Sequence, residues 1–173
     1  MWDFFQTVRH RHSVRQYQHD CPVEDEKLHA ILETACSAPT AGDLQSYRIF
    51  VVKNVEMRHQ LSEASKGQDF IAAAPVCLVF CADVERSKQE FGQRGESLYA
   101  LQDTTIAASY AQLAVVAAGM GSTWIGEFDE NKVTEVLSLN AGLKPIALLS
   151  LGYPAELPQP SVRRRLDDIV KYL

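Results

Sequence analysis

Basic residues gather near both ends of this chain, although its formal net charge is −5. Like charges at close spacing repel one another unless an anion or an acidic group lies nearby. Arginine guanidinium groups donate bidentate hydrogen bonds, and phosphate accepts them well. Since the two ends of a folded chain often lie close together, these segments could converge on one phosphate site. The residues concerned are Arg9, His10, Arg11, His12, Ser13 and Arg15, and Arg163, Arg164 and Arg165.

The same basic residues also fit roles that involve no ligand. Arginine near the end of a helix complements the helix dipole, and the run 163–165 beside Asp167 and Asp168 fits a solvated surface. The mild acidity of the whole chain argues against a broad nucleic-acid-binding surface, although a local one stays open. We find no G-x-G-x-x-G element in a βαβ unit, so no Rossmann nicotinamide site is predicted.

Length and composition are typical of one globular domain, predicted to span residues 1–173, with 46% apolar and 23% charged residues. No secretory leader or membrane span is predicted. The cysteines show no metal-ligand spacing, so we interpret all of them as reduced thiols of a cytoplasmic protein and predict no metal site. Two of them, Cys77 and Cys81, share one predicted strand and stand roughly 13 Å apart, too far for a disulfide. The other two are Cys21 and Cys36.

Three apolar runs predict strands that are covered on both faces: residues 47–53, 75–83 and 145–154. A shorter strand and turn is expected at 122–128. Helices are predicted at the N-terminus, from residue 24 to about residue 36, over 55–65, over 98–118 and over 130–139. The helix 98–118 is apolar on more than one side and must therefore be central in the fold. The polar segment 84–97 shows no clear helical or strand period. The sum is a mixed, layered protein of helices and strands.

Four segments, in order along the chain, resemble the nitroreductase family of flavin mononucleotide (FMN) oxidoreductases. RHSVR at 11–15 resembles the family's opening motif, Arg-Arg/His-Ser-x-Arg/Lys. APTAGDLQSYRIFVV at 38–52 resembles its Ala-Pro-Ser-x-x-Asn-x-Gln-Pro-Trp segment. GMGSTWIGEFD at 119–129 resembles its Gly-Leu-Gly segment and the turn that follows, and RRRLDDIV at 163–170 resembles its basic tail. Each motif is weak alone, but the ordered set is specific.

The resemblance implies an α+β fold in which a central mixed, mostly antiparallel sheet is flanked by helices in α/β/α layers. It also implies an enzyme that passes hydride from NADH or NADPH through flavin N5 to a small electron acceptor, such as a nitroaromatic or a quinone, in a ping-pong cycle. No catalytic side chain is implied, because the flavin carries the chemistry. Family members of this kind are homodimers with FMN at the subunit interface, much of it formed by the long helix, here 98–118.

The resemblance also assigns site residues. The FMN phosphate and pyrimidine edge fall to the opening motif and the tail, the ring edge to Gln68, and the backbone facing N5 to the turn at 125–127. The loop 39–45 would reach the flavin of the partner subunit. The implied set is Arg11, His12, Ser13, Arg15, Pro39, Thr40, Ala41, Asp43, Gln45, Gln68, Ile125, Gly126, Glu127, Arg163 and Arg164.

Three departures from the family pattern fall in the loop: Asp43 replaces Asn, Ser46 replaces Pro and Tyr47 replaces Trp. A carboxylate accepts hydrogen bonds but cannot donate them, and its charge disfavours added electron density on a nearby ring, so we expect either a flavin potential lower than is typical or loss of this contact. The segment 84–97 is a candidate lid, with Phe91 and, just beyond it, Tyr99 as its aromatics. Three alternatives stay open: a specialised flavin dehalogenase or dehydrogenase, a protein that holds FMN without turnover, and a nucleotide- or nucleic-acid-binding domain that uses the basic segments.

Overall fold

The fold is built on one sheet of four strands, described in a computed structural model for residues 3–156 and 161–173. Its strand order is β1-β2-β4-β3, and every neighbouring pair is antiparallel. Among the described residues the only parallel pairing is an isolated bridge between Ser13 and Ser122. The strands are β1 (Tyr47–Val52), β2 (Val76–Asp83), β3 (Gly121–Ile125) and β4 (Leu143–Gly152).

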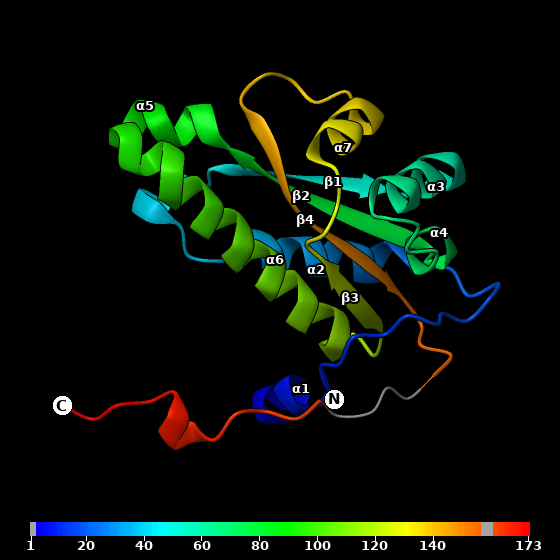
Figure 1. Ribbon diagram of the computed structural model, residues 1–173. Helices are drawn as coiled ribbons and strands as arrows, with labels where there is room; N and C mark the ends of the chain where they lie inside the picture. The colour runs from blue at the N-terminus through cyan, green and yellow to red at the C-terminus, as the bar shows by residue number, and fades with distance from the viewer. Residues whose placement is uncertain (1–2, 157–160) are drawn as a thin grey trace.

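Helices cover both faces of this sheet, so the predicted α/β/α layering is confirmed (Figure 1). Alternate residues of β2 enter the two layers: Leu78 and Phe80 pack with α2 and α6, while Cys77 and Val79 pack with α3, α4 and α7. The two buried clusters explain why β2 and β4 read as continuous apolar runs. The helices are α1 (Phe4–His10), α2 (Asp25–Cys36), α3 (Val55–Ala64), α4 (Phe70–Ala73), α5 (Val84–Arg94), α6 (Ala100–Ala117) and α7 (Glu130–Leu137).

The predicted long helix is α6, which runs under the sheet and is preceded by a π-helical turn, η2 (Gly95–Tyr99). The polar segment 84–97, for which no period was found, folds as α5 with a kink at Gly92, where φ is 60°. A kink resets the helical phase, and this interruption accounts for the missing period. Short 3-10 turns, η1 (Ala41–Asp43) and η3 (Leu166–Asp168), complete the order.

The N-terminal helix and the C-terminal tail leave much of their apolar surface exposed. On α1, Phe4 and Phe5 are 66% and 70% exposed, and on the tail Tyr172 is 86% exposed. Figure 1 shows the tail running past α1 and away from the sheet. Among the described residues no helix is both long enough and apolar enough to cross a membrane.

All four cysteines are free thiols in the structure. Cys77 and Cys81 are buried in β2, and burial raises the pKa of each thiol to about 12. Their thiols therefore stay protonated at neutral pH and fill space in the core. Among the described residues, no group of three His, Cys, Asp or Glu side chains could hold a metal ion.

Candidate functional site

The first basic segment is held against the open edge of the sheet by backbone hydrogen bonds. The N–H of Val14 donates to Ser122 O at 3.1 Å, and the Thr123 hydroxyl donates to Val14 O at 2.5 Å. Further along, the N–H of Gln18 donates to Tyr153 O at 2.8 Å. Val14 is buried, so extended backbone turns its neighbours Ser13 and Arg15 away from the core. The sheet edge thereby presents the motif outward.

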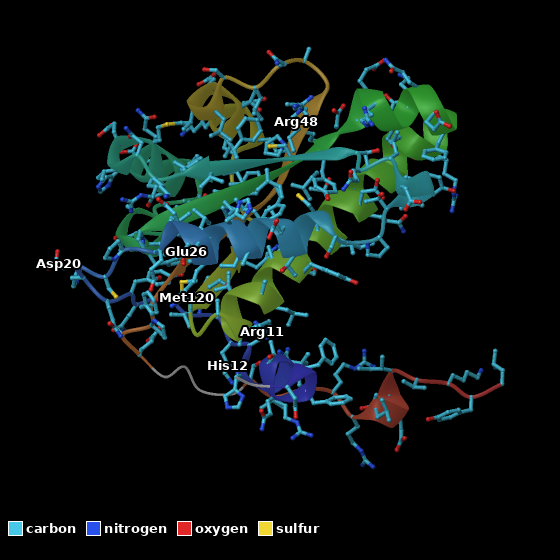
Figure 2. The ribbon with its side chains drawn as sticks, turned by 180° about the vertical axis from the view of Figure 1, so that it is seen from behind. Arg11, His12, Asp20, Glu26, Arg48 and Met120 are labelled. Carbon is cyan, nitrogen blue, oxygen red and sulfur yellow. The ribbon has the colours of Figure 1, made fainter. Side chains whose placement is uncertain are left out.

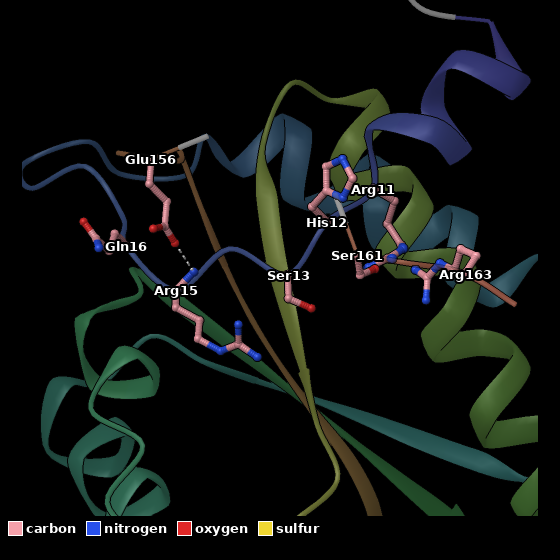
Figure 3. Close-up of a pocket in the computed structure, with 8 residues that line it drawn as sticks. All are labelled: Arg11, His12, Ser13, Arg15, Gln16, Glu156, Ser161 and Arg163. Carbon is pink, nitrogen blue, oxygen red and sulfur yellow. Dashed lines mark hydrogen bonds between the residues drawn. The ribbon is translucent and has the colours of Figure 1, made fainter. Parts of the chain in front are cut away.

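Both basic segments line one cavity of about 670 Å³. Figure 3 shows the Arg11 and Arg163 side chains pointing toward one another, with Ser161 beside them. The predicted meeting of the two segments is thus observed for Arg11, Arg15 and Arg163, whereas the function of these residues stays a prediction. The cavity is lined by Arg11, His12, Ser13, Arg15, Gln16, Glu156, Ser161 and Arg163.

The charges in this cavity are unfavourable to one another when no anion is present. Burial lowers the pKa of the Arg11 guanidinium, and the nearby charge of Arg163 lowers it further. Arginine stays protonated despite such a shift, so the two positive charges persist. The carboxylate of Glu156 partly offsets these positive charges. It is held in the cavity by a hydrogen bond, in which the backbone N–H of Arg15 donates to Glu156 Oε1 at 3.0 Å. Such a set of guanidinium and hydroxyl donors fits a phosphate group.

The other arginines of the tail lie outside the set that lines the cavity. The Arg164 guanidinium donates to the backbone oxygen of Asp168 at 2.7 Å, and Arg165 lies 3.8 Å from the Asp167 carboxylate. The role that the resemblance gives Arg164 stays a prediction. Both contacts fall within the tail and match the solvated-surface alternative for these two residues.

The turn after β3 lies on the same side of the sheet as the cavity. Arg15 reaches over the ring of Phe70, 5.7 Å from its centre, and two residues before Phe70 the Gln68 amide donates to Glu127 O at 3.5 Å. The Glu127 carboxylate pairs with Lys66. Ile125 is the buried last residue of β3, while Gly126 and Glu127 are exposed. The structure therefore brings Gln68 and the turn 125–127 together beside the first basic segment.

The loop 39–45 lies at the other end of the sheet. The N–H of Asp83, the last residue of β2, donates to Ser46 O at 2.9 Å, which places the loop at that end. The cavity is tied to the opposite end, because Ser122 pairs with Leu151 and Leu151 pairs with Val76, the first residue of β2. Seven residue steps of about 3.3 Å separate the two ends by about 23 Å. Within one chain, the loop residues Pro39, Thr40, Ala41, Asp43 and Gln45 do not join the cavity residues.

Sequence reasoning missed Gln16, Glu156 and Ser161 in the cavity lining. Gln16 directly follows the motif, and its proximity was a usable signal. Glu156 and Ser161 stand in a segment without periodicity or motif, and only the path of the chain brings them to Arg11. Also missed was Asp103, the one charged residue of helix α6, which is 2% exposed. A charge in such a helix is itself a signal, since it needs a polar partner.

A layered α+β fold with a cavity lined by basic side chains at its sheet edge indicates the class of protein. The sequence model of the nitroreductase family matches residues 8–68 and 65–153, and the chain belongs to that family.

Similar proteins agree with this assignment. A Thermus thermophilus protein called NADH dehydrogenase is 34% identical, and the match covers 92% of this chain and 91% of the relative. A Bacillus subtilis FMN reductase [NAD(P)H] is 31% identical, over 95% of this chain and 74% of the relative. Among solved structures, B. megaterium NfrA2 superposes with a TM-score of 0.92 at 28% identity, covering 99% of this chain and 74% of that one.

Inorganic phosphate should stabilise the wild-type chain against heat, and should stabilise an Arg11→Gln variant much less. A ligand that binds only the folded state adds stability that grows with the logarithm of its concentration divided by its Kd, and one charge-assisted contact contributes roughly 1.5–3 kcal/mol. Without phosphate, the variant should be no less stable than the wild type, because the repulsion from Arg163 is removed. Melting temperatures over a phosphate series measure both effects.

Arg48→Gln is the matched control, since Arg48 is exposed on β1 and lies on the opposite side of the molecule from Arg11 (Figure 2). Its response to phosphate should equal that of the wild type. Equal responses from Arg11→Gln and Arg48→Gln would contradict the assignment of the cavity.

Proposed function

We propose that this chain is an FMN-dependent oxidoreductase that takes hydride from NADH or NADPH and delivers it to a small electron acceptor. The observation that carries the proposal is the cavity in which Arg11, Ser13 and Arg15 meet Arg163, in a chain of the nitroreductase family. Relatives named as an FMN reductase [NAD(P)H] and an oxygen-insensitive NADPH nitroreductase support it. The latter, from Salmonella typhimurium, is 33% identical, over 84% of this chain and 63% of the relative.

The cavity residues fit the phosphate end of FMN. A phosphate monoester carries up to two negative charges and three acceptor oxygens, and the cavity offers three guanidinium groups and the Ser13 hydroxyl. The burial of Arg11 strengthens such contacts, because fewer water molecules compete with the phosphate. His12 lines the same cavity and completes the motif. These residues would bind and orient FMN without taking part in bond making.

In the turn 125–127, the backbone of Gly126 and Glu127 would face flavin N5, and Gln68 would contact the ring edge. Gln68 is tied to the turn through Glu127 O, and the N–H of Asp129 donates to Ala64 O at 2.8 Å, so the turn is fixed on two sides. A fixed backbone donor costs no reorganisation when charge develops near it. FMN, when bound, supplies the hydride-accepting ring, and the chain's own part is to bind, orient and exclude competing reactions.

The separation between the cavity and the loop 39–45 supports a homodimer with FMN at the interface. A single chain presents these two parts of the family's flavin site at opposite ends of its sheet, about 23 Å apart. A second copy can bring its own loop to the cavity side. The geometry therefore favours a site shared between two chains.

The exposed apolar surface supports the same arrangement. Besides α1 and the tail, α6 exposes Leu101 and Tyr110, 44% and 38%. An apolar cavity of about 720 Å³ lies between α1, α2 and α6, with Ile31 and Leu113 among its lining residues. Monomeric proteins rarely leave contiguous apolar surface of this kind in water. A second chain on this face would cover it.

Several finer points belong to the proposal. NAD(P)H and the acceptor, a nitroaromatic, a quinone or a similar molecule, would occupy the same space in turn, which gives ping-pong kinetics. Residues 1–173 would act as one domain. A cytoplasmic location stays a prediction, as does the lid role of the segment 84–97.

The purified protein should take up FMN, and the bound flavin should be bleached by NADH or NADPH without oxygen. With a quinone as acceptor, double-reciprocal plots at several acceptor concentrations should be parallel. Spectra and steady-state rates measure these outcomes. A chain that refuses FMN would refute the proposal, and one that binds FMN but is not reduced would favour the alternative of a non-catalytic flavin carrier.

Mixed dimers should restore activity if the flavin site is shared. Arg11→Glu damages the cavity, and Gly42→Val damages the loop, because a Cβ at Gly42 would stand 2.9 Å from Phe91 Cζ and φ there is +56°. Each variant alone should be nearly inactive. A heterodimer of the two, purified through two different tags after co-expression, contains one undamaged site and should regain about half the activity of the wild type. Failure of the heterodimer to regain activity would place both segments in one chain's site.

Asp43→Asn should raise the flavin potential by tens of millivolts, because removing a negative charge near the ring favours the electron-rich reduced state. Asp43 is exposed with φ 54°, a conformation that asparagine also adopts, so the backbone should not change. Redox titration measures the shift. Asp20→Asn is the matched control, because Asp20 is exposed in another loop with φ 58°, and its potential should stay that of the wild type.

A further inference from the structure

The buried carboxylate of Asp103, on α6, holds together the backbone at Ala41 and at Ser46, near the two ends of the loop 39–46. Asp103 is 2% exposed, and its two oxygens accept two backbone N–H groups. Oδ1 accepts from Ala41 N at 2.9 Å and Oδ2 accepts from Ser46 N at 3.3 Å. Burying a carboxylate is costly unless hydrogen bonds compensate it, and these two bonds supply the compensation.

The backbone between these two anchors has an unusual conformation. Gly42, Asp43 and Gln45 have φ values of 56°, 54° and 52°. Non-glycine residues in this region persist only where their surroundings hold them. Within the loop, the N–H of Gln45 donates to Thr40 Oγ1 at 3.1 Å, and the Gln45 amide donates to Cys36 O at 3.0 Å. Asp103, unlike these partners, lies on a separate helix, and it holds the backbone at both Ala41 and Ser46.

The second anchor lies at a position where this sequence departs from the nitroreductase pattern. Ser46 stands where the nitroreductase pattern has proline, which has no N–H to donate. Proline stiffens a backbone by fixing φ, and serine does not. In this chain, a hydrogen bond from Ser46 to the buried carboxylate constrains the same point.

We propose that Asp103 is a positioning residue: it holds the loop 40–46 in the one conformation that faces the flavin of a second chain, and its bond to Ser46 N–H replaces the stiffness of proline. This inference rests on the proposed function, since the loop meets a flavin only in an FMN-binding dimer. Asp103 itself touches neither substrate nor cofactor. It acts through the backbone of Ala41 and Ser46.

Asp103→Asn tests the proposal with little change of volume. An amide has one acceptor oxygen, and its NH₂ group would face a backbone N–H, so one anchor is lost and a donor meets a donor. Amide hydrogen exchange at Ala41 and Ser46, measured without added FMN, should become at least about tenfold faster. In the FMN-loaded protein, kcat should fall about tenfold and the flavin absorbance should shift. FMN should still bind through the cavity.

Asn54→Ala is the matched control, because Asn54 caps α3 by accepting Met57 N at 3.0 Å and lies outside the proposed site. It should lower the melting temperature and leave loop exchange, flavin absorbance and kcat unchanged. If Asp103→Asn behaves as this control does, the proposal is overturned. Wild-type protein that binds no FMN would instead overturn the proposed function, and the exchange measurement distinguishes the two failures.

Ser46→Pro keeps the test decisive even if Asp103→Asn does not fold. This substitution removes the Ser46 donor and leaves the carboxylate and Ala41 N–H in place. It should leave flavin absorbance and kcat close to those of the wild type, because proline restores the stiffness that the hydrogen bond supplies. A Ser46→Pro variant whose kcat falls severalfold would overturn the claim that the Ser46 hydrogen bond replaces the stiffness of proline.

Discussion

The attachment of residues 13–18 to the edge of the sheet is the constraint on which the candidate site depends. Val14 pairs with Ser122, and the buried Tyr17 hydroxyl donates to Val14 O at 2.8 Å. This approach requires glycine at position 121, since a Cβ there would stand 2.5 Å from a methyl group of Val14. With Val14 fixed in the core, the alternation of an extended chain turns Ser13 and Arg15 outward. A basic motif in sequence thereby becomes a cavity wall.

The sheet also explains why one chain carries two separate parts of the proposed site. Antiparallel pairing places the cavity beside the first residue of β2, and it places Ser46, where the loop 39–46 ends, beside the last residue of β2. The α5 and η2 segments pack at the loop end, where the Arg86 side chain donates to Leu44 O at 3.0 Å and Phe91 lies against Gly42. The segment predicted as a lid is therefore joined to the loop rather than to the cavity. In a dimer, both would approach the flavin together.

Much of the fold followed from apolar patterning, because β2, β4 and α6 are buried on more than one side and their sequences show it. The ends of elements and the segment 84–97 were harder to predict, since the kink at Gly92 interrupts any helical period. The site was predictable where a motif names residues close in sequence, as at 11–15. Glu156, Ser161 and Asp103 escaped, because their roles arise from contacts between residues far apart in the chain, and short-range patterns carry no such information.

The carboxylate in the cavity has a consequence for selectivity among anions. Three guanidinium groups, from Arg11, Arg15 and Arg163, and one carboxylate, from Glu156, leave two formal positive charges. A singly esterified phosphate carries nearly two negative charges at neutral pH, so its charge would balance that of the cavity. A polyphosphate chain or a nucleic-acid strand would bring more negative charge than the cavity can balance, and Glu156 would repel the surplus. If the cavity binds an anion as proposed, charge matching would favour a terminal phosphate over a polyanion.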